Sequence, residues 1–150
     1  MRIYAASDHA GFSLKKALVT EARRFGHEVT DLGPDDEQRV DYPDFAAAVG
    51  RAVAGDPGSR GLICCGTGIG VCIAANKVPG VRCAVVWDEA TARLSREHND
   101  ANVLAIGGRL FSVNDAVRML DVWLTTNFEG GRHAERVEKI RRLEDEARGG

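Results

Sequence analysis

Short apolar runs alternate with longer helical patterns along the chain. The first unit is predicted to contain a strand over residues 2–6, a helix over 11–25 and a second strand over 27–32. Within the helix, Leu14 and Leu18 lie on one apolar stripe, as expected of a helix that packs on a sheet. The chain therefore opens with a β-α-β unit.

The same alternation continues to the end of the chain. It predicts further strands over 61–65, 81–86 and 102–106, a helix after the loop 66–70, and helices over 41–54, 88–97, 113–126 and 132–147. The run 61–65 is apolar without alternation, which is typical of a parallel strand covered on both faces. Five strands alternating with helices predict a doubly wound α/β fold, with ligands bound at the carboxyl ends of the strands.

Composition narrows the class of protein. The 150 residues, without a visible repeat or linker, predict a single domain over 1–150. A formal net charge of −2 gives no broad basic surface, so nucleic acid is not an expected partner. No apolar run approaches the roughly 18 to 20 residues of a membrane span, and the N-terminal residues lack a secretion signal. Four cysteines without zinc-type spacing favour a reduced, cytoplasmic protein and no metal.

The first candidate site is the loop 65–70, CGTGIG, between a buried strand and a helix. Its three glycines let backbone N–H groups approach an anion, although a tight turn needing positive φ is an equal alternative. The spacing is not that of a dinucleotide fingerprint. Cys65 stands where a helix N-terminus favours a thiolate that can act as a base. Cys64, Cys72 and Cys83 are interpreted as small buried apolar residues.

The second candidate segment, Ser7-Asp8-His9, follows the first strand and is predicted to lie beside the glycine loop. His9 is suited to contact an anion and Asp8 to hold a sugar hydroxyl. The alternative is that Ser7 and Asp8 only cap the following helix.

Two further polar segments lie nearer the C-terminus. The loop 96–102 is dense in polar groups, and its His98 is the candidate for proton transfer, whereas His27 is assigned a surface or packing role. Arg132 and Arg136 stand four residues apart at the start of a helix, so they share a face that fits a phosphate. An ordinary solvated face is the alternative.

Six motifs in this order resemble the ribose-5-phosphate isomerase B family, which includes allose- and galactose-phosphate isomerases. They are SDHAG at 7–11, DYPD at 41–44, CGTGIG at 65–70, AANK at 74–77, SREHN at 95–99 and GGRH at 130–133. The resemblance extends from residue 1 to about residue 143. It implies a Rossmann-like three-layer α/β/α sandwich with a five-stranded parallel sheet. It also implies a homodimer or homotetramer with a shared active site, and an aldose–ketose isomerase without metal or cofactor.

The resemblance also implies roles for individual residues. Cys65 is the base that moves a proton between C2 and C1, Thr67 lies near O1 and O2, and His98 assists ring opening. The amide cradle is Gly66, Gly68 and Gly70; the hydroxyl contacts are Asp8 and Asn99; the phosphate contacts are His9, Arg109, Arg132 and Arg136; and His133 flanks the site. Some family members use a glutamate at the position of Val71 in place of the cysteine, so this chain resembles the thiol type.

The expected reaction is the interconversion of ribose 5-phosphate and ribulose 5-phosphate, a step of the pentose phosphate pathway, through a cis-enediolate. Allose 6-phosphate, galactose 6-phosphate or a tetrose phosphate are alternative substrates because their pockets share every motif. A noncatalytic sugar-phosphate-binding protein is an alternative of another class. A nucleotide-binding domain is disfavoured by the glycine spacing.

Overall fold

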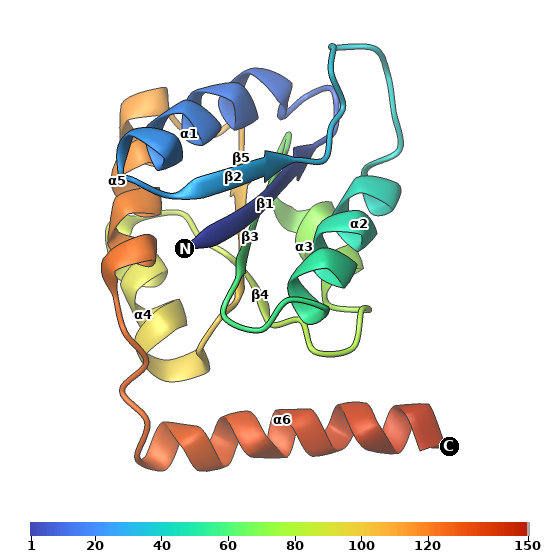
Figure 1. Cartoon of the computed structure of the whole chain (residues 1–150), viewed down its shortest axis with the longest axis vertical. Helices are drawn as coiled ribbons and strands as arrows, with labels where there is room; N and C mark the ends of the chain where they lie inside the picture. The colour runs from blue at the N-terminus through green and yellow to red at the C-terminus, as the bar shows by residue number, and fades with distance from the viewer. Residues whose placement is uncertain (150) are drawn as a thin grey trace.

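The computed structural model describes residues 1–149, and within them one sheet of five parallel strands lies between layers of helices (Figure 1). The strands are β1 (Arg2–Ser7), β2 (Glu28–Asp31), β3 (Arg60–Cys65), β4 (Cys83–Val85) and β5 (Val103–Gly107). Their order in the sheet is β2-β1-β3-β5-β4, and each neighbouring pair is parallel. The predicted fold class is confirmed. Gly150, the last residue of the predicted domain, lies outside the described residues.

Helices cover both faces of this sheet. They are α1 (Phe12–Arg24), α2 (Tyr42–Ala54), α3 (Ile69–Ala75), α4 (Glu89–Asn99), α5 (Val113–Thr125) and α6 (Arg132–Gly149). One core cluster joins α1, α4 and α5 to the sheet, and a second cluster joins α2 and α3 to the opposite face. Side chains of a strand alternate between its faces, so Cys64 enters the first cluster and Cys65 the second.

Complete burial of the central strands explains their sequence. All residues of β5, and all residues of β3 after Arg60, are buried. A strand that helices cover on both faces has no solvent-exposed face, so its sequence does not alternate between apolar and polar residues. The run 61–65 predicted such a strand.

Most boundaries lie within a residue of the predicted ones, and three elements differ by more. Strand β4 contains only three residues, at the edge of the sheet, in place of the predicted run 81–86. Helix α6 continues to Gly149. Helix α4 continues to Asn99, so His98 lies in its last turn and not in a loop. Asp100 ends α4 in a left-handed conformation, φ 46°, while its carboxylate pairs with Arg96 one turn earlier at 2.9 Å.

Helix α6 lies beside the body of the fold rather than within a layer (Figure 1). Near its start His133 stacks on His98 of α4, and further along the Glu144 carboxylate accepts a hydrogen bond from the Gly80 N–H at 2.9 Å. Ile140 and Leu143 remain 46% and 65% exposed. Within residues 1–149, every helix is too short or too polar to span a lipid bilayer.

Candidate active site

Three loops meet at the carboxyl edge of the sheet, where β1, β3 and β5 end. The Asp8 N–H donates to the Cys64 carbonyl at 3.1 Å, and the Gly108 N–H donates to the Cys65 carbonyl at 2.7 Å. The Arg109 N–H donates to the Gly66 carbonyl at 3.0 Å. The predicted proximity of residues 7–9 to the glycine loop is therefore confirmed.

The thiol of Cys65 is held inside the glycine loop. Its Sγ accepts a hydrogen bond from the Gly68 N–H at 3.0 Å, and the residue is only 5% exposed. The backbone of the glycine loop therefore fixes the position of this sulfur. Thr67 is exposed on the same loop, and its Oγ1 accepts from the Ile69 N–H at 3.2 Å.

Two glycines shape this loop. Gly68 has a φ of +82°, a conformation that other residues adopt only with strain. Gly107, at the end of β5, lies so close to the loop that a Cβ atom there would stand 2.5 Å from the Thr67 carbonyl carbon. The tight-turn requirement predicted as an alternative therefore exists, and it coexists with N–H donors around the thiol.

The other cysteines occupy different environments. Cys64 is fully buried on the opposite face of β3, where burial raises the pKa of its thiol. Cys72 and Cys83 are intermediate in exposure and pack against the second core cluster, so their interpretation as buried apolar residues holds only in part. A hydrogen bond with the Cys83 side chain lowers the pKa of Cys72 to about 7. The edge position of β4 leaves this pair accessible.

Asp8 uses one carboxylate oxygen to organise the start of α1. Its Oδ1 accepts from the Gly11 N–H at 2.9 Å, and the residue is 7% exposed. The bond closes the turn that leads into α1, whose N-cap residue is Gly11, but α1 has no side-chain cap hydrogen bond, so Asp8 does not cap the helix in the predicted sense. Ser7 differs, because its hydroxyl is buried and has no hydrogen-bond partner among the described residues.

His9 is oriented by the loop that follows β2. Its Nδ1 accepts from the Val40 N–H at 3.3 Å, which leaves the ring proton on Nε2 as a donor for an anion. The same loop is anchored by buried Lys15, whose ammonium contacts the Asp31 carboxylate at 2.9 Å and the Pro34 carbonyl at 2.7 Å.

Arg109 adds a positive charge at this edge. A Cβ atom at Gly66 would lie 3.3 Å from the Arg109 Nη1, so the guanidinium packs directly over the glycine loop. The predicted residues of the carboxyl edge are thus brought together: Asp8, His9, Cys65, Gly66, Thr67, Gly68, Gly70 and Arg109.

The remaining predicted residues lie at the opposite, amino edge of the sheet. Because α4 runs back antiparallel to the strands, its last turn with His98 and Asn99 comes near the point where the strands begin. The adjacent Asp100 lines the same pocket as Arg60, the first residue of β3. The five residue steps along β3 separate the two edges by about 16 Å. Within one chain, His98 therefore does not lie beside Cys65.

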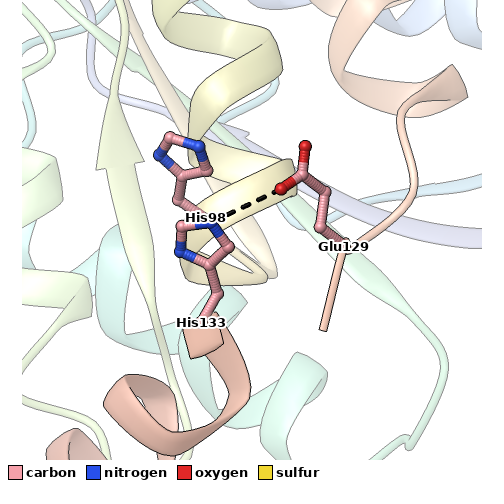
Figure 2. Close-up of side chains that lie close together, drawn as sticks. All are labelled: His98, Glu129 and His133. Atoms are coloured by element: carbon pink, nitrogen blue, oxygen red, sulfur yellow. Dashed lines mark ion pairs between the residues drawn. The ribbon is translucent and has the colours of Figure 1, made fainter. Parts of the chain in front are cut away.

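At the amino edge, His98 contacts a residue that the sequence assigned only to the flank of the site. The His98 and His133 rings stack with centroids 4.1 Å apart and an interplanar angle of 14°. His133 is buried, which lowers the pKa of its imidazole. Its Nε2 lies 3.4 Å from a Glu129 carboxylate oxygen (Figure 2). Glu129 was not among the predicted site residues, because an isolated exposed glutamate carries no sequence signal.

Arg132 and Arg136 lie in the first turns of α6, near His133. They share the amino edge with His98 and Asn99. The basic side chains of the candidate site are therefore divided between the two edges: His9 and Arg109 at one, Arg132 and Arg136 at the other.

These features define a class first: a doubly wound α/β protein with a thiol, a glycine loop and basic side chains at the carboxyl edge of its sheet. Residues 3–140 match the family model described as Ribose/Galactose Isomerase. The chain belongs to the ribose/galactose isomerase family.

Several relatives match almost the whole chain. Ribose-5-phosphate isomerase B of Escherichia coli (strain K12) is 45% identical over 143 residues, which are 95% of this chain and 96% of that protein. The solved structure of ribose-5-phosphate isomerase B from Clostridium thermocellum has a TM-score of 0.95 and 47% identity, over 98% of this chain and 99% of that one. The Mycoplasma genitalium ribose-5-phosphate isomerase B, solved with bound ribulose-5-phosphate, has a TM-score of 0.93 and 44% identity, over 97% of both chains.

Proposed function

We propose that the protein interconverts ribose 5-phosphate and ribulose 5-phosphate. The observation that carries this proposal is the Cys65 thiol, held by the Gly68 N–H in a loop beside Thr67 and Arg109. The family, and the relative solved with ribulose-5-phosphate, support this choice of substrate. The reaction requires no redox cofactor because the oxidation of C2 is balanced by the reduction of C1 in the same sugar.

In the proposed reaction, Cys65 acts as its thiolate. The thiolate removes the C2 proton of the open-chain aldose, the C2 electrons form the C1–C2 double bond of a cis-enediolate, and the same proton returns to C1. The O2 proton passes to O1, assisted by Thr67 and the loop N–H donors. A placed base contributes about 10² to 10⁴ in rate and an oxyanion donor about 10² to 10³, so phosphate anchoring must supply much of the remaining acceleration.

We further propose that two subunits share each active site. His98 and Asn99 lie at the edge opposite Cys65, and a second copy that brings its amino edge to this carboxyl edge completes the set. His98 of one subunit then assists ring opening at Cys65 of the other, and Asn99 joins Asp8 in binding sugar hydroxyls. Arg132 and Arg136 join His9 and Arg109 around the phosphate. The exposed Ile140 and Leu143 of α6 support a contact between copies.

The alternative substrates differ from ribose 5-phosphate in the number of carbon atoms of the sugar. Allose 6-phosphate, galactose 6-phosphate and a tetrose phosphate share the reacting C1 and C2 and the terminal phosphate. The free cysteines fit a reduced cytoplasmic enzyme, and we propose that location.

The deciding experiment is a coupled isomerase assay of the purified protein with four-, five- and six-carbon aldose phosphates. The proposal expects the highest kcat/KM with ribose 5-phosphate. A higher kcat/KM with a six-carbon sugar phosphate would assign that sugar phosphate as the substrate, while the proposed isomerisation chemistry would remain. Binding of ribose 5-phosphate without any turnover would favour the noncatalytic alternative.

A further inference from the structure

Three potential metal ligands converge at the amino edge from separate segments of the chain. His98 comes from the end of α4, Glu129 from the segment before α6, and His133 from the first turn of α6 (Figure 2). One ligand atom from each lies within 4.8 Å of the others. The surrounding backbone brings these distant sequence positions together.

Backbone hydrogen bonds hold the three residues near one another. The Glu129 N–H donates to the Glu97 carbonyl at 3.1 Å, which ties the Glu129 segment to the residue before His98. The His133 N–H donates to the Gly130 carbonyl at 3.1 Å. His133 is buried, whereas the Glu129 side chain is 53% exposed, so the cluster is anchored on one side and open to solvent on the other.

The spacing suits a first-row transition metal. Zn²⁺ binds imidazole nitrogen and carboxylate oxygen at about 2.0 to 2.2 Å, so neighbouring ligand atoms of a tetrahedral site stand roughly 3.3 to 3.6 Å apart. The 3.4 Å between the His133 Nε2 and the Glu129 oxygen already falls in this range. The His98 and His133 rings are stacked nearly parallel, so binding one ion requires the His98 side chain to rotate out of the stack until its nitrogen lone pair points to that ion.

We propose that His98, Glu129 and His133 form a binding site for a divalent transition-metal cation of the Zn²⁺ type. Two imidazoles favour this class of cation over Mg²⁺ or Ca²⁺, which prefer oxygen ligands. Three protein ligands leave a fourth position for water. The charges of Arg132 and Arg136 lie close to His133 and oppose a cation, so the affinity is below that of a structural zinc site.

Occupancy of this site has a consequence that depends on the proposed function. A cation bound to His98 withdraws that imidazole from ring opening, so the metal inhibits the isomerase reversibly. The binding itself does not depend on the proposed function and is measured separately.

The test is a calorimetric titration of chelator-treated full-length protein with Zn²⁺, repeated with Co²⁺ and read by visible absorption. One ion per chain is expected, with the Co²⁺ spectrum lacking a thiolate charge-transfer band. Glu129→Gln and His133→Gln are each expected to weaken binding at least tenfold. Glu129→Gln is the safer variant because its exposed side chain is not part of the core.

The matched control is His27→Gln, which removes a histidine whose Nδ1 lies 3.2 Å from the N-terminal amine. It is expected to bind Zn²⁺ like the wild type. Equal affinity in all variants, a thiolate band, or weakening only in His27→Gln would overturn the proposed site.

Inhibition is then measured with ribose 5-phosphate. Zn²⁺ is expected to inhibit the wild type, with recovery on adding EDTA, and to inhibit Glu129→Gln at concentrations at least tenfold higher. Binding at the site without inhibition would refute the inhibitory role. A protein inactive on every sugar phosphate would refute the proposed function, while the titration would still decide the metal site.

Discussion

The two edges of the sheet hold their functional side chains in different ways. At the carboxyl edge, loops from the adjacent strands β1, β3 and β5 are joined by backbone hydrogen bonds, and Cys65 is fixed within them. At the amino edge, His98 and His133 project from helix ends and are held by ring stacking and by the 3.4 Å contact between the His133 Nε2 and the Glu129 carboxylate. Within one chain, the first arrangement is therefore fixed by the backbone of three adjacent loops. The second depends on contacts between side chains, and under the proposed function its groups act at the carboxyl edge of another subunit.

Replacement of the base is the largest expected effect at the carboxyl edge. Cys65→Ala is expected to lower kcat about 10² to 10⁴-fold while ribose 5-phosphate still binds, because a general base is lost without removing the phosphate contacts. Steady-state kinetics and a binding titration measure the two effects. Cys64→Ala, on the opposite face of the same strand, is the control and is expected to retain turnover once its folding is verified. Wild-type turnover in Cys65→Ala would remove the assigned base.

Mixing two inactive variants tests whether the edges of different subunits cooperate. Cys65→Ala and His98→Gln chains, unfolded and refolded together, are expected to regain about one quarter of wild-type activity if the enzyme is a dimer. Half of the dimers are then mixed, and each mixed dimer has one site with both residues intact. Each variant refolded alone provides the baseline. No recovery, despite mixed dimers verified by mass, would show that both residues serve from one chain.

Close packing at the carboxyl edge predicts a moderate effect at Gly107. Gly107→Ala places a methyl group against the Thr67 backbone, so we expect a loss of about 1 to 3 kcal/mol in unfolding free energy and a lower kcat. Urea unfolding and kinetics measure both. Gly149→Ala is the control, because a Cβ atom there meets nothing within 4 Å. Equal unfolding free energies of the two variants would mean that the loop moves away from the added methyl group without any loss of stability.

The smallest expected effect is a pH dependence in the alkylation of Cys72, which lies near the edge of the sheet. Alkylation of Cys72 by iodoacetamide is expected to accelerate as pH rises through about 7, since the thiolate is the reacting form and becomes the major species above its pKa. Mass spectrometry of digested protein follows each residue. Cys64, buried and with a raised pKa, is the internal control and should remain unlabelled. Equal labelling of the two would contradict their different environments.

Much of the fold could be predicted from periodicity. The apolar run at 61–65 predicted a central parallel strand, and alternation of strands and helices predicted the layers. Strand β4 was predicted too long, because apolar residues flanking a short edge strand have the same pattern as strand residues. The end of α4 was missed, since the Asp100–Arg96 pair that accompanies it has no distinct sequence signature.

The candidate site could be predicted only in part. Residues that directly follow parallel strands, such as Asp8, His9 and Cys65, were correctly expected to be neighbours, because strand direction fixes their edge. His98 was predicted as a loop residue of the same site, whereas the direction of α4 carries it to the other edge. Glu129 and the stacking of His133 on His98 depend on how the segment before α6 crosses α4.

By itself, the amino-acid sequence determined the parallel layered fold, the glycine loop around Cys65 and the family, because periodicity and local motifs act over short stretches of chain. Only the tertiary structure decided which side chains meet. The edge at which a residue lies depends on the direction of its helix or strand, and contacts such as that between His98 and His133 join segments 35 residues apart in the chain.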